Sequence, residues 1–288
     1  MSAEGLLLVD KPAGVTSHDV VNVARRALGE RRVGHAGTLD PFATGLLVVL
    51  AGRATRLVPH VSGDPKVYAA TVRFGAETDT EDLHGAVVRE ADPPAEVAVR
   101  AAVRHLVGTL DQVPPLYSAK RVQGRRAYDL ARAGEVVELA PVPVRVDAFD
   151  VLAWRDASGV MECDVRVTCG PGTYIRSLAR DLGRSVGSAA HLTALRRERS
   201  GRFDVRDAVT LDVLKGGDVS VRPALQALPE HPVERLDAVD VRRATGGIRV
   251  LAHTAGAWAA LVDGTSGALV ALGERAGDHW QPRVVLHG

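Results

Sequence analysis

The feature that most limits how this chain can fold is an unbroken apolar run, GLLVVLAG, at residues 45–52. Its length is that of a strand, and a glycine stands at each end. A strand that is apolar on both sides must be covered on both faces. The run therefore predicts a sheet buried on both faces. The stretch GHAGTLDPFAT precedes it directly, so Asp40 places a carboxylate at the edge of the predicted core.

Other segments show a mixture of helical and strand periodicities that do not alternate regularly. This pattern favours an α+β fold. The helix that follows the first strand should begin with Ser17 as its N-cap and end at Gly29. Residues 5–12, 45–52, 66–75, 146–156 and 161–170 are expected as strands, and residues 17–29, 96–110, 128–133 and 173–187 as helices.

The C-terminal part reads differently from the rest. Residues 223–235, PALQALPEHPVER, contain three prolines and are expected to form a connection. Short strand-like pieces separated by turn residues follow, which predicts a small all-β module of about sixty residues. We therefore expect two domains, residues 1–225 and residues 230–288.

Composition excludes several classes of protein. With 288 residues, 46% hydrophobic and 25% charged, the chain is typical of a globular protein. It shows no signal peptide and no apolar run near the ~20 residues of a membrane span. Cys163 and Cys169 do not form a disulfide framework, and we expect inert thiols in a cytoplasmic protein.

Charge is distributed unevenly, although the net charge is only +1. Lys and Arg outnumber Asp and Glu by seven to three in residues 11–56 and by eight to three in residues 176–206. A polyanionic partner explains such clusters, because Lys and Arg neutralise phosphates. Solvated Arg-rich helix faces explain them equally well.

Motifs for nucleotide cofactors and metals are absent. The acidic stretch TDTEDLHG, residues 78–85, lacks the spacing of a calcium loop, and we expect a solvated acidic loop there. We therefore predict neither a cofactor nor a metal. Asp40 followed by Pro41 has a purely structural interpretation, with Asp as an N-cap and Pro at the first helical position.

Six segments, in order and at compatible separations, give the chain a specific resemblance. It resembles the TruB family, the bacterial tRNA pseudouridine-55 synthases, through nearly all of residues 5–212. The segments are GLLLVDKPAGVTSHDVV, VGHAGTLDPFATGLLVV, KVYAATVRFGAETDTEDLHG, QVPPLYSAKRVQGRRAYDLARAGE, CGPGTYIRSLARDLG and AHLTALRRERSGRF. The resemblance implies a pseudouridine synthase catalytic fold with a central mixed, largely antiparallel sheet flanked by helices. It also implies a small C-terminal β-rich PUA-like module that binds RNA.

The resemblance also implies the reaction and three catalytic residues. Uridine-55 in the T loop of tRNA would be flipped out of its stack and isomerised to pseudouridine. Asp40 would attack C1′ or remove a proton from C2′, and the sequence leaves both routes open. Arg176 would pair with Asp40, and Tyr68 would stack on the uracil.

Four further residues are expected to bind the substrate. By resemblance, His35 would fill the space that the flipped base leaves, and Gly37 would let the loop approach the RNA closely. Tyr174 and Leu195 would line the pocket, while Lys11 and Pro12 would shape a neighbouring loop. For His35 the residues alone favour a solvent-facing loop position, and for Tyr68, Tyr174 and Leu195 an ordinary place in the core. A complete active site in one chain predicts a monomer.

Two other functions stay open on the residues alone. GHAG is a G-x-x-G, the loop with which KH domains clamp nucleic acid, so a non-catalytic RNA-binding protein or tRNA chaperone is one alternative. A glycosidase that uses Asp40 with an acid from DTED is the other, and it requires two converging carboxylates.

Overall fold

A computed structural model describes residues 3–61, 63–118, 121–122, 125–126, 139–157, 159–217 and 219–286. The chain forms two compact units. Met1–Ser62 and Arg202–Gly288 make up unit 1, and Gly63–Gly201 make up unit 2. The helix expected at residues 128–133 lies outside the described residues.

Unit 1 contains the apolar strand predicted at residues 45–52. Strand β3 pairs antiparallel with both β1 and β2, and β1 pairs in parallel with β14. Alternate side chains of β1 and β3 enter two different hydrophobic clusters, so both faces are covered as predicted. These strands are β1 (Gly5–Lys11), β2 (Val33–Ala36), β3 (Thr44–Ala51) and β14 (Val209–Thr210).

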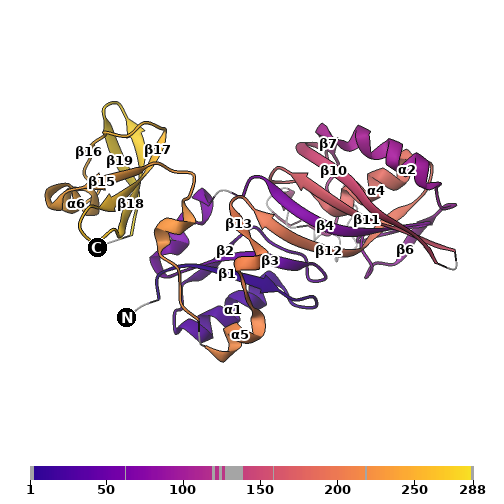
Figure 1. Cartoon of the computed structure of the whole chain (residues 1–288), viewed down its shortest axis with the longest axis horizontal. Helices are drawn as coiled ribbons and strands as arrows, with labels where there is room; N and C mark the ends of the chain where they lie inside the picture. The colour runs from indigo at the N-terminus through magenta and orange to yellow at the C-terminus, as the bar shows by residue number, and fades with distance from the viewer. Residues whose placement is uncertain are drawn as a thin grey trace. The chain divides into compact units, whose positions relative to one another are not determined.

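Helices α1 (Ser17–Leu28) and α5 (Leu211–Gly216) pack side by side over one face of β1 and β3 (Figure 1). The N-cap of α1 is Thr16 and not Ser17. The Thr16 hydroxyl accepts from the Asp19 N–H, and the Asp19 carboxylate accepts from the Thr16 N–H, which forms a capping box. Gly29 ends the helix with φ 60°, as predicted. Unit 1 also includes η1 (Gly52–His60), β13 (Phe203–Asp204), η3 (Val205–Asp207) and η4 (Ala224–Ala227).

The C-terminal part of unit 1 is a five-stranded curled sheet in the order β15-β17-β18-β19-β16. Its β-rich character is confirmed, but the expectation of an all-β module is wrong. Asp237 caps a helix, α6 (Ala238–Thr245), that the periodicity of the flanking strands obscured. The strands are β15 (Val233–Leu236), β16 (Val250–Leu251), β17 (Trp258–Asp263), β18 (Leu269–Ala276) and β19 (His279–Val285).

This sheet shares a hydrophobic cluster with β1 and β3 inside the same unit. The Arg53 and Arg56 guanidinium groups also donate to the carbonyls of Leu286 and Val285, at 2.9 and 2.7 Å. The C-terminal module is therefore packed against the N-terminal strands. A boundary between residues 225 and 230 stays a prediction.

Unit 2 is built on an antiparallel sheet in the order β12-β4-β11-β10-β7. Helix α4 (Ile175–Ser185) packs against β12, and its first turn buries two apolar residues, Ile175 and Leu178, together with Arg176 and Ser177. The strands are β4 (Lys66–Phe74), β7 (Gly108–Gln112), β10 (Val142–Ala157), β11 (Val160–Cys169) and β12 (Ala190–Ser200). Together with the mixed strands of unit 1, this confirms the α+β class.

Smaller elements complete unit 2. The helix expected over residues 96–110 is shorter, because residues after 107 form β7. The others are β5 (Ala76–Thr78), β6 (Val87–Glu90), α2 (Glu96–Ala102), η2 (Val103–Leu106), β8 (Arg121–Val122) and β9 (Arg125–Arg126).

Candidate active site

Asp40 lies in a loop, residues 37–43, that connects β2 to β3 in unit 1; we call it the Asp40 loop. Gly37 opens it with φ 85°, a conformation that favours glycine. The Ala43 N–H donates to the Asp40 carbonyl at 3.1 Å, which closes a single turn. No helix begins there, so the interpretation of Asp40 and Pro41 as a helix start is wrong.

Lys11 holds the Asp40 loop from one side. Its side chain is fully buried, and the ammonium donates to the carbonyls of Pro12, Val15 and Pro41 at 3.0, 2.7 and 3.2 Å. The Gly14 N–H donates to the same Pro41 carbonyl at 2.9 Å. A buried cation must be compensated, and here converging carbonyl dipoles contribute to that. Lys11 thus joins the loop after β1 to the Asp40 loop, in agreement with its predicted shaping role.

Ser17 holds the Asp40 loop from the other side. Its buried hydroxyl donates to the Leu39 carbonyl at 3.0 Å and accepts from the Leu39 N–H at 2.9 Å. The neighbours Leu39 and Phe42 are both buried. Asp40 itself is half-buried. The carboxylate is therefore carried by a backbone that is fixed on both sides of it, which is what the position at the core edge suggested.

His35 also belongs to unit 1, but not to a loop. It is a half-buried residue of β2 and lies opposite Val49 of β3. The residues alone favoured a solvent-facing loop position, and the structure shows a paired strand instead. The ring is therefore carried on a rigid element that leads directly into Gly37 and the Asp40 loop.

Tyr68 and Leu195 lie on adjacent strands of unit 2. Tyr68 of β4 is opposite Arg197 of β12, while Leu195 is opposite Ala70. Residues two apart in a strand share a face, so Tyr68, Leu195 and Arg197 stand on the same face of the sheet. Tyr68 and Leu195 are each 7% exposed and Arg197 is 1% exposed. The structure thus brings two of the predicted residues together beside a buried cation.

Tyr174 precedes α4 and is half-buried. Its backbone is gripped by one side chain: the Gln112 amide oxygen accepts from the Tyr174 N–H at 2.9 Å, and the Gln112 amide nitrogen donates to the Tyr174 carbonyl at 3.1 Å. Gln112 is almost fully buried at the end of β7. The sequence gave no signal for this contact, because Gln112 lies 62 residues away.

Arg176, in the first turn of α4, is 3% exposed and is not a solvated helix residue. Two of its guanidinium nitrogens donate to main-chain carbonyls, to Thr80 at 2.8 Å and to Tyr117 at 2.9 Å. The acceptors come from segments 96 and 59 residues away. A planar guanidinium held at two points has a fixed plane and direction.

Two of the three acids in the stretch that the sequence predicted as a solvated loop are buried. Glu81 and Asp82 are each 8% exposed, while Asp79 is half-buried. Ser177 and Arg180 of α4 both donate to the Glu81 carboxylate. Burial raises the pKa of Glu81, and the Arg180 guanidinium opposes this increase. The solvated-loop expectation is therefore wrong for Glu81, which is matched to Arg180 of α4, and for Asp82, which accepts from the Thr80 hydroxyl and the His84 N–H.

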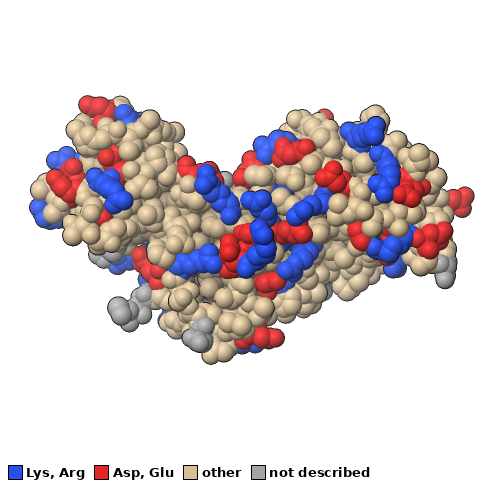
Figure 2. Space-filling view, in the orientation of Figure 1, with Lys and Arg blue, Asp and Glu red and all other residues tan. Residues whose placement is uncertain are grey.

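Basic residues of the segment 176–206 are partly paired with acids. Arg184 donates to Glu77 at 2.6 Å and Arg202 to Glu230 at 2.8 Å. Basic and acidic side chains are likewise interspersed on the face shown in Figure 2. The Arg176 and Arg180 side chains are buried, so a solvated helix face does not explain these two residues.

Cys163 and Cys169 are free and buried in β11. Burial raises the pKa of the Cys163 thiol to about 12 and that of Cys169 to about 11, as expected of unreactive thiols. Among the described residues, no three His, Cys, Asp or Glu side chains gather as metal ligands would. Within the same part of the chain, no helix is long and apolar enough to cross a membrane.

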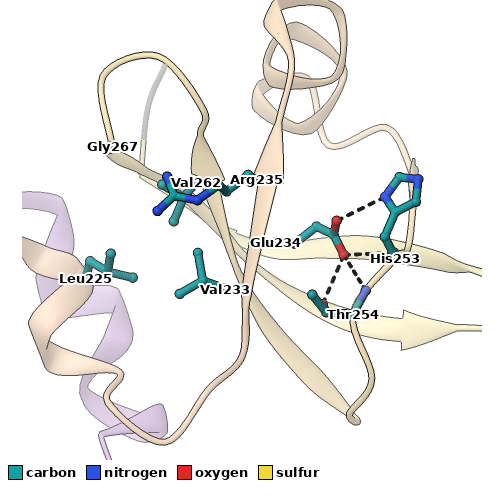
Figure 3. Close-up of a pocket in the computed structure, with 8 residues that line it drawn as sticks. All are labelled: Leu225, Val233, Glu234, Arg235, His253, Thr254, Val262 and Gly267. Carbon is teal, nitrogen blue, oxygen red and sulfur yellow. Dashed lines mark hydrogen bonds and ion pairs between the residues drawn. The ribbon is translucent and has the colours of Figure 1, made fainter.

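A pocket in unit 1 lies beside β15 of the C-terminal sheet and includes none of the predicted site residues (Figure 3). At its edge, the Glu234 carboxylate accepts from the N–H groups of His253 and Thr254, both at 2.9 Å, and from the Trp280 indole at 2.9 Å. These donors hold the pKa of Glu234 at about 2 although burial opposes them. This carboxylate therefore ties the module together.

The seven predicted site residues fall into two groups. His35, Gly37 and Asp40 belong to unit 1, and Tyr68, Tyr174, Arg176 and Leu195 belong to unit 2. Tyr68 lies on β4, which pairs with β11 and β12, and His35 lies on β2, which pairs with β3. The supporting residues that sequence reasoning missed are Gln112, Glu81, Ser177 and Arg180.

Comparison with known proteins decides the family. The model of the TruB family pseudouridylate synthase N-terminal domain matches residues 25–175, and the tRNA pseudouridylate synthase B C-terminal domain matches residues 176–227. The chain belongs to the TruB family. It is an isomerase of the pseudouridine synthase class, as the six segments predicted.

Relatives match over much or all of their length. The tRNA pseudouridine synthase B of Thermobifida fusca is 48% identical over 295 residues, which cover 99% of each chain. That of Mycolicibacterium paratuberculosis is 51% identical over 216 residues, 74% of each chain. The archaeal box H/ACA Nop10–Cbf5 complex contains a chain of the same fold, with a TM-score of 0.71 and 24% identity over 99% of this chain and 86% of that one.

Proposed function

We propose that this chain isomerises uridine-55 to pseudouridine in the T loop of tRNA. The full-length similarity to proteins named tRNA pseudouridine synthase B supports tRNA as the substrate. The observation that carries the chemical part is the Asp40 loop, which presents a carboxylate on a backbone fixed by Lys11 and Ser17. We further propose that one chain acts alone in the cytoplasm.

The reaction rearranges bonds within one nucleotide. The N1–C1′ bond breaks, the uracil turns while held, C5 bonds to C1′, and the C5 proton leaves as N1 gains one. Nothing is oxidised or added. In our proposal Asp40 starts the reaction, either as a nucleophile at C1′ or as a base at C2′. A rigid loop suits both routes, because neither tolerates a misplaced carboxylate.

Arg176 is proposed as the partner of the Asp40 carboxylate. Support comes from its guanidinium, which is buried and oriented by the Thr80 and Tyr117 carbonyls. A guanidinium held in this way can face a carboxylate with its remaining N–H groups. Such a pair would fix the direction of the Asp40 carboxylate.

Tyr68 is proposed to stack on the uracil, with Leu195 and Tyr174 as further walls of the pocket. Tyr68 and Leu195 share one face of the sheet, which supports a common role. His35 is proposed to occupy the space that the flipped base leaves, and Gly37 to let the RNA backbone approach. Extrusion of a stacked base costs a few kcal/mol, so a residue that fills the gap is useful.

Tritium release tests the proposal. A tRNA transcript labelled with tritium at uridine C5 is incubated with the wild type, Asp40→Asn and the control Asp212→Asn, whose side chain is 89% exposed. We expect about one tritium released per tRNA by the wild type and by the control. Asp40→Asn should release none while it still binds tRNA.

Substrate position is tested with a second transcript that carries cytidine at position 55. We expect no tritium release from it. Release from that transcript would contradict the uridine-55 assignment. If the wild type bound the uridine-55 transcript but released no tritium from it, a tRNA chaperone would be favoured. Release of free uracil would indicate a glycosidase. A sedimentation mass of two chains would contradict the monomer.

A further inference from the structure

Glu81 has a backbone conformation that L-residues rarely adopt. Its φ is 60°, and among the described residues it is the one non-glycine with a positive φ. Such a conformation costs about 1 kcal/mol for a residue with a Cβ, and glycine would avoid this cost. The backbone conformation at this position favours glycine, yet the residue is a glutamate. The contacts of the Glu81 side chain explain why.

The unusual φ determines where the preceding carbonyl points. The Thr80 carbonyl belongs to the peptide group between residues 80 and 81, whose orientation depends on φ of Glu81. With φ of the ordinary sign, that peptide group would face a different direction. In the observed conformation the Thr80 carbonyl accepts from the Arg176 guanidinium at 2.8 Å.

The main chain and side chain of Glu81 are both tied to surrounding elements. The Glu81 N–H donates to the Thr78 carbonyl at 3.0 Å, and the Leu192 N–H of β12 donates to the Glu81 carbonyl at 3.1 Å. Its carboxylate accepts from the Ser177 hydroxyl at 2.8 Å and from the Arg180 guanidinium. Arg180 in turn donates to the Val113 carbonyl at 2.9 Å.

Ser177 and Arg180 stand on α4 one and four residues after Arg176. The turn whose Thr80 carbonyl orients the Arg176 guanidinium is thus hydrogen-bonded, through Glu81, to the helix that carries Arg176. The three residues of this contact, Glu81, Ser177 and Arg180, are each less than one-tenth exposed. Displacement of Glu81 would leave the buried Arg180 guanidinium with Asp181 as its carboxylate partner, without Glu81, and would release the Thr80 peptide group.

We propose that Glu81 is a positioning residue for the reaction, which fixes the Thr80 carbonyl against the Arg176 guanidinium through its contacts with Ser177 and Arg180. This inference rests on the proposed function, in which Arg176 faces the catalytic carboxylate. Under this proposal the Glu81 side chain affects kcat only through the orientation of the Arg176 guanidinium.

A double-mutant cycle tests the assignment. Glu81→Gln is made in the wild type and in Arg176→Lys, and kcat, KM for tRNA and the melting temperature are measured by tritium release and thermal unfolding. Glu90→Gln is the matched control, because Glu90 is an exposed residue of the neighbouring strand β6. Glu81→Gly keeps the backbone conformation accessible but removes the carboxylate.

In the wild-type background we expect Glu81→Gln to lower kcat about tenfold or more, with KM changed less than about twofold, because the guanidinium is misaligned. In the Arg176→Lys background the same change should alter kcat by less than about twofold. Glu81→Gly should behave like Glu81→Gln, which separates the carboxylate from the backbone. Glu90→Gln should match the wild type.

Equal losses in the two backgrounds would overturn the assignment, since a general loss of structure does not depend on Arg176. An unchanged kcat for Glu81→Gln in an active wild type would overturn it while leaving the proposed function intact. A wild type that makes no pseudouridine would overturn both. Where Glu81→Gln does not fold, Ser177→Ala removes one contact of the carboxylate, and its kcat should fall only in the presence of Arg176.

Discussion

The Asp40 loop and the turn around Glu81 each surround a buried charged group, but the groups have opposite sign. In unit 1 the Lys11 ammonium gathers three main-chain carbonyls, and the loop backbone takes its shape around this one cation. In unit 2 the Glu81 carboxylate is held by a hydroxyl and a guanidinium on one helix. In unit 1 one ammonium serves three acceptors, and in unit 2 one carboxylate has two donors.

The two regions should therefore respond differently to a single substitution. Loss of the Lys11 ammonium in unit 1 removes a donor from three main-chain carbonyls at once. Loss of one donor to Glu81 in unit 2 leaves the other donor in place. Substitutions in both regions test this contrast.

Lys11→Met removes the ammonium and keeps the length of the side chain. We expect the free energy of unfolding to fall by about 3 kcal/mol or more, because the carbonyls of Pro12 and Val15 lose the ammonium and the Pro41 carbonyl keeps only the Gly14 N–H. Urea denaturation measures this change. Lys215→Met is the control: its side chain is 56% exposed, so stability should change by less than about 0.5 kcal/mol. Similar losses for the two variants would contradict the central role of Lys11.

Arg176→Lys keeps the positive charge but removes the planar fork. We expect kcat to fall about a hundredfold, equivalent to about 2.7 kcal/mol of transition-state stabilisation, because an ammonium does not hold one plane between the Thr80 and Tyr117 carbonyls. Tritium release under single-turnover conditions measures it. Arg104→Lys, at an exposed position of η2, should retain wild-type activity. A kcat within threefold of wild type for Arg176→Lys would show that orientation of the guanidinium is unimportant.

Two buried serines provide a matched comparison of the regions. Ser17 makes two hydrogen bonds to the backbone of Leu39, and Ser177 donates one to Glu81. Ser17→Ala should lower the free energy of unfolding by about 2 kcal/mol, and Ser177→Ala by about 1 kcal/mol, since Arg180 still serves the carboxylate. Chemical denaturation of both variants gives the ranking. A larger loss of unfolding free energy for Ser177→Ala than for Ser17→Ala would contradict this contrast between the two regions.

The fold was predictable where the hydrophobic periodicity was strong and where glycine or a capping residue marked the end of an element. The doubly apolar run from Leu46 to Leu50, the helix that ends at Gly29 and the strands expected at residues 146–156 and 161–170 all appeared as predicted. Helix α6 was missed because it has only eight residues and lies between short strands. The Asp–Pro pair at residues 40–41 carries a helix-start signal that the loop contacts of Lys11 and Ser17 override.

The candidate site was predictable only as far as its motif positions. Tyr68 and Leu195 share a face through strand register, but register between β4 and β12 cannot be read from one sequence. Gln112, Glu81 and Arg180 were missed because their contacts join segments far apart in the chain. Acidic residues in a short polar stretch look solvated unless the buried arginines that match them are known.

Two buried glutamates give the last prediction, which concerns pH. Burial raises the pKa of Glu81 above 4.5, so its folded form binds a proton more readily than its unfolded form. The stability that this proton contributes is complete below pH 4.5 and is lost as pH rises through the raised pKa. Donated hydrogen bonds lower the pKa of Glu234 to about 2, so its contribution is present above pH 4.5 and is lost as pH falls toward 2.

The free energy of unfolding of the wild type minus that of each glutamine variant should therefore change with pH in opposite directions. For Glu81→Gln the difference should decrease as pH rises from 4.5, and for Glu234→Gln it should decrease as pH falls from 4.5. Urea titrations at a series of pH values measure both slopes. The Glu81 slope should be the shallower, because Arg180, Ser177 and Arg176 all oppose the effect of burial. If the difference for Glu81→Gln instead decreased as pH falls, the arginines would outweigh burial, and Glu81 and Arg180 would form a full ion pair.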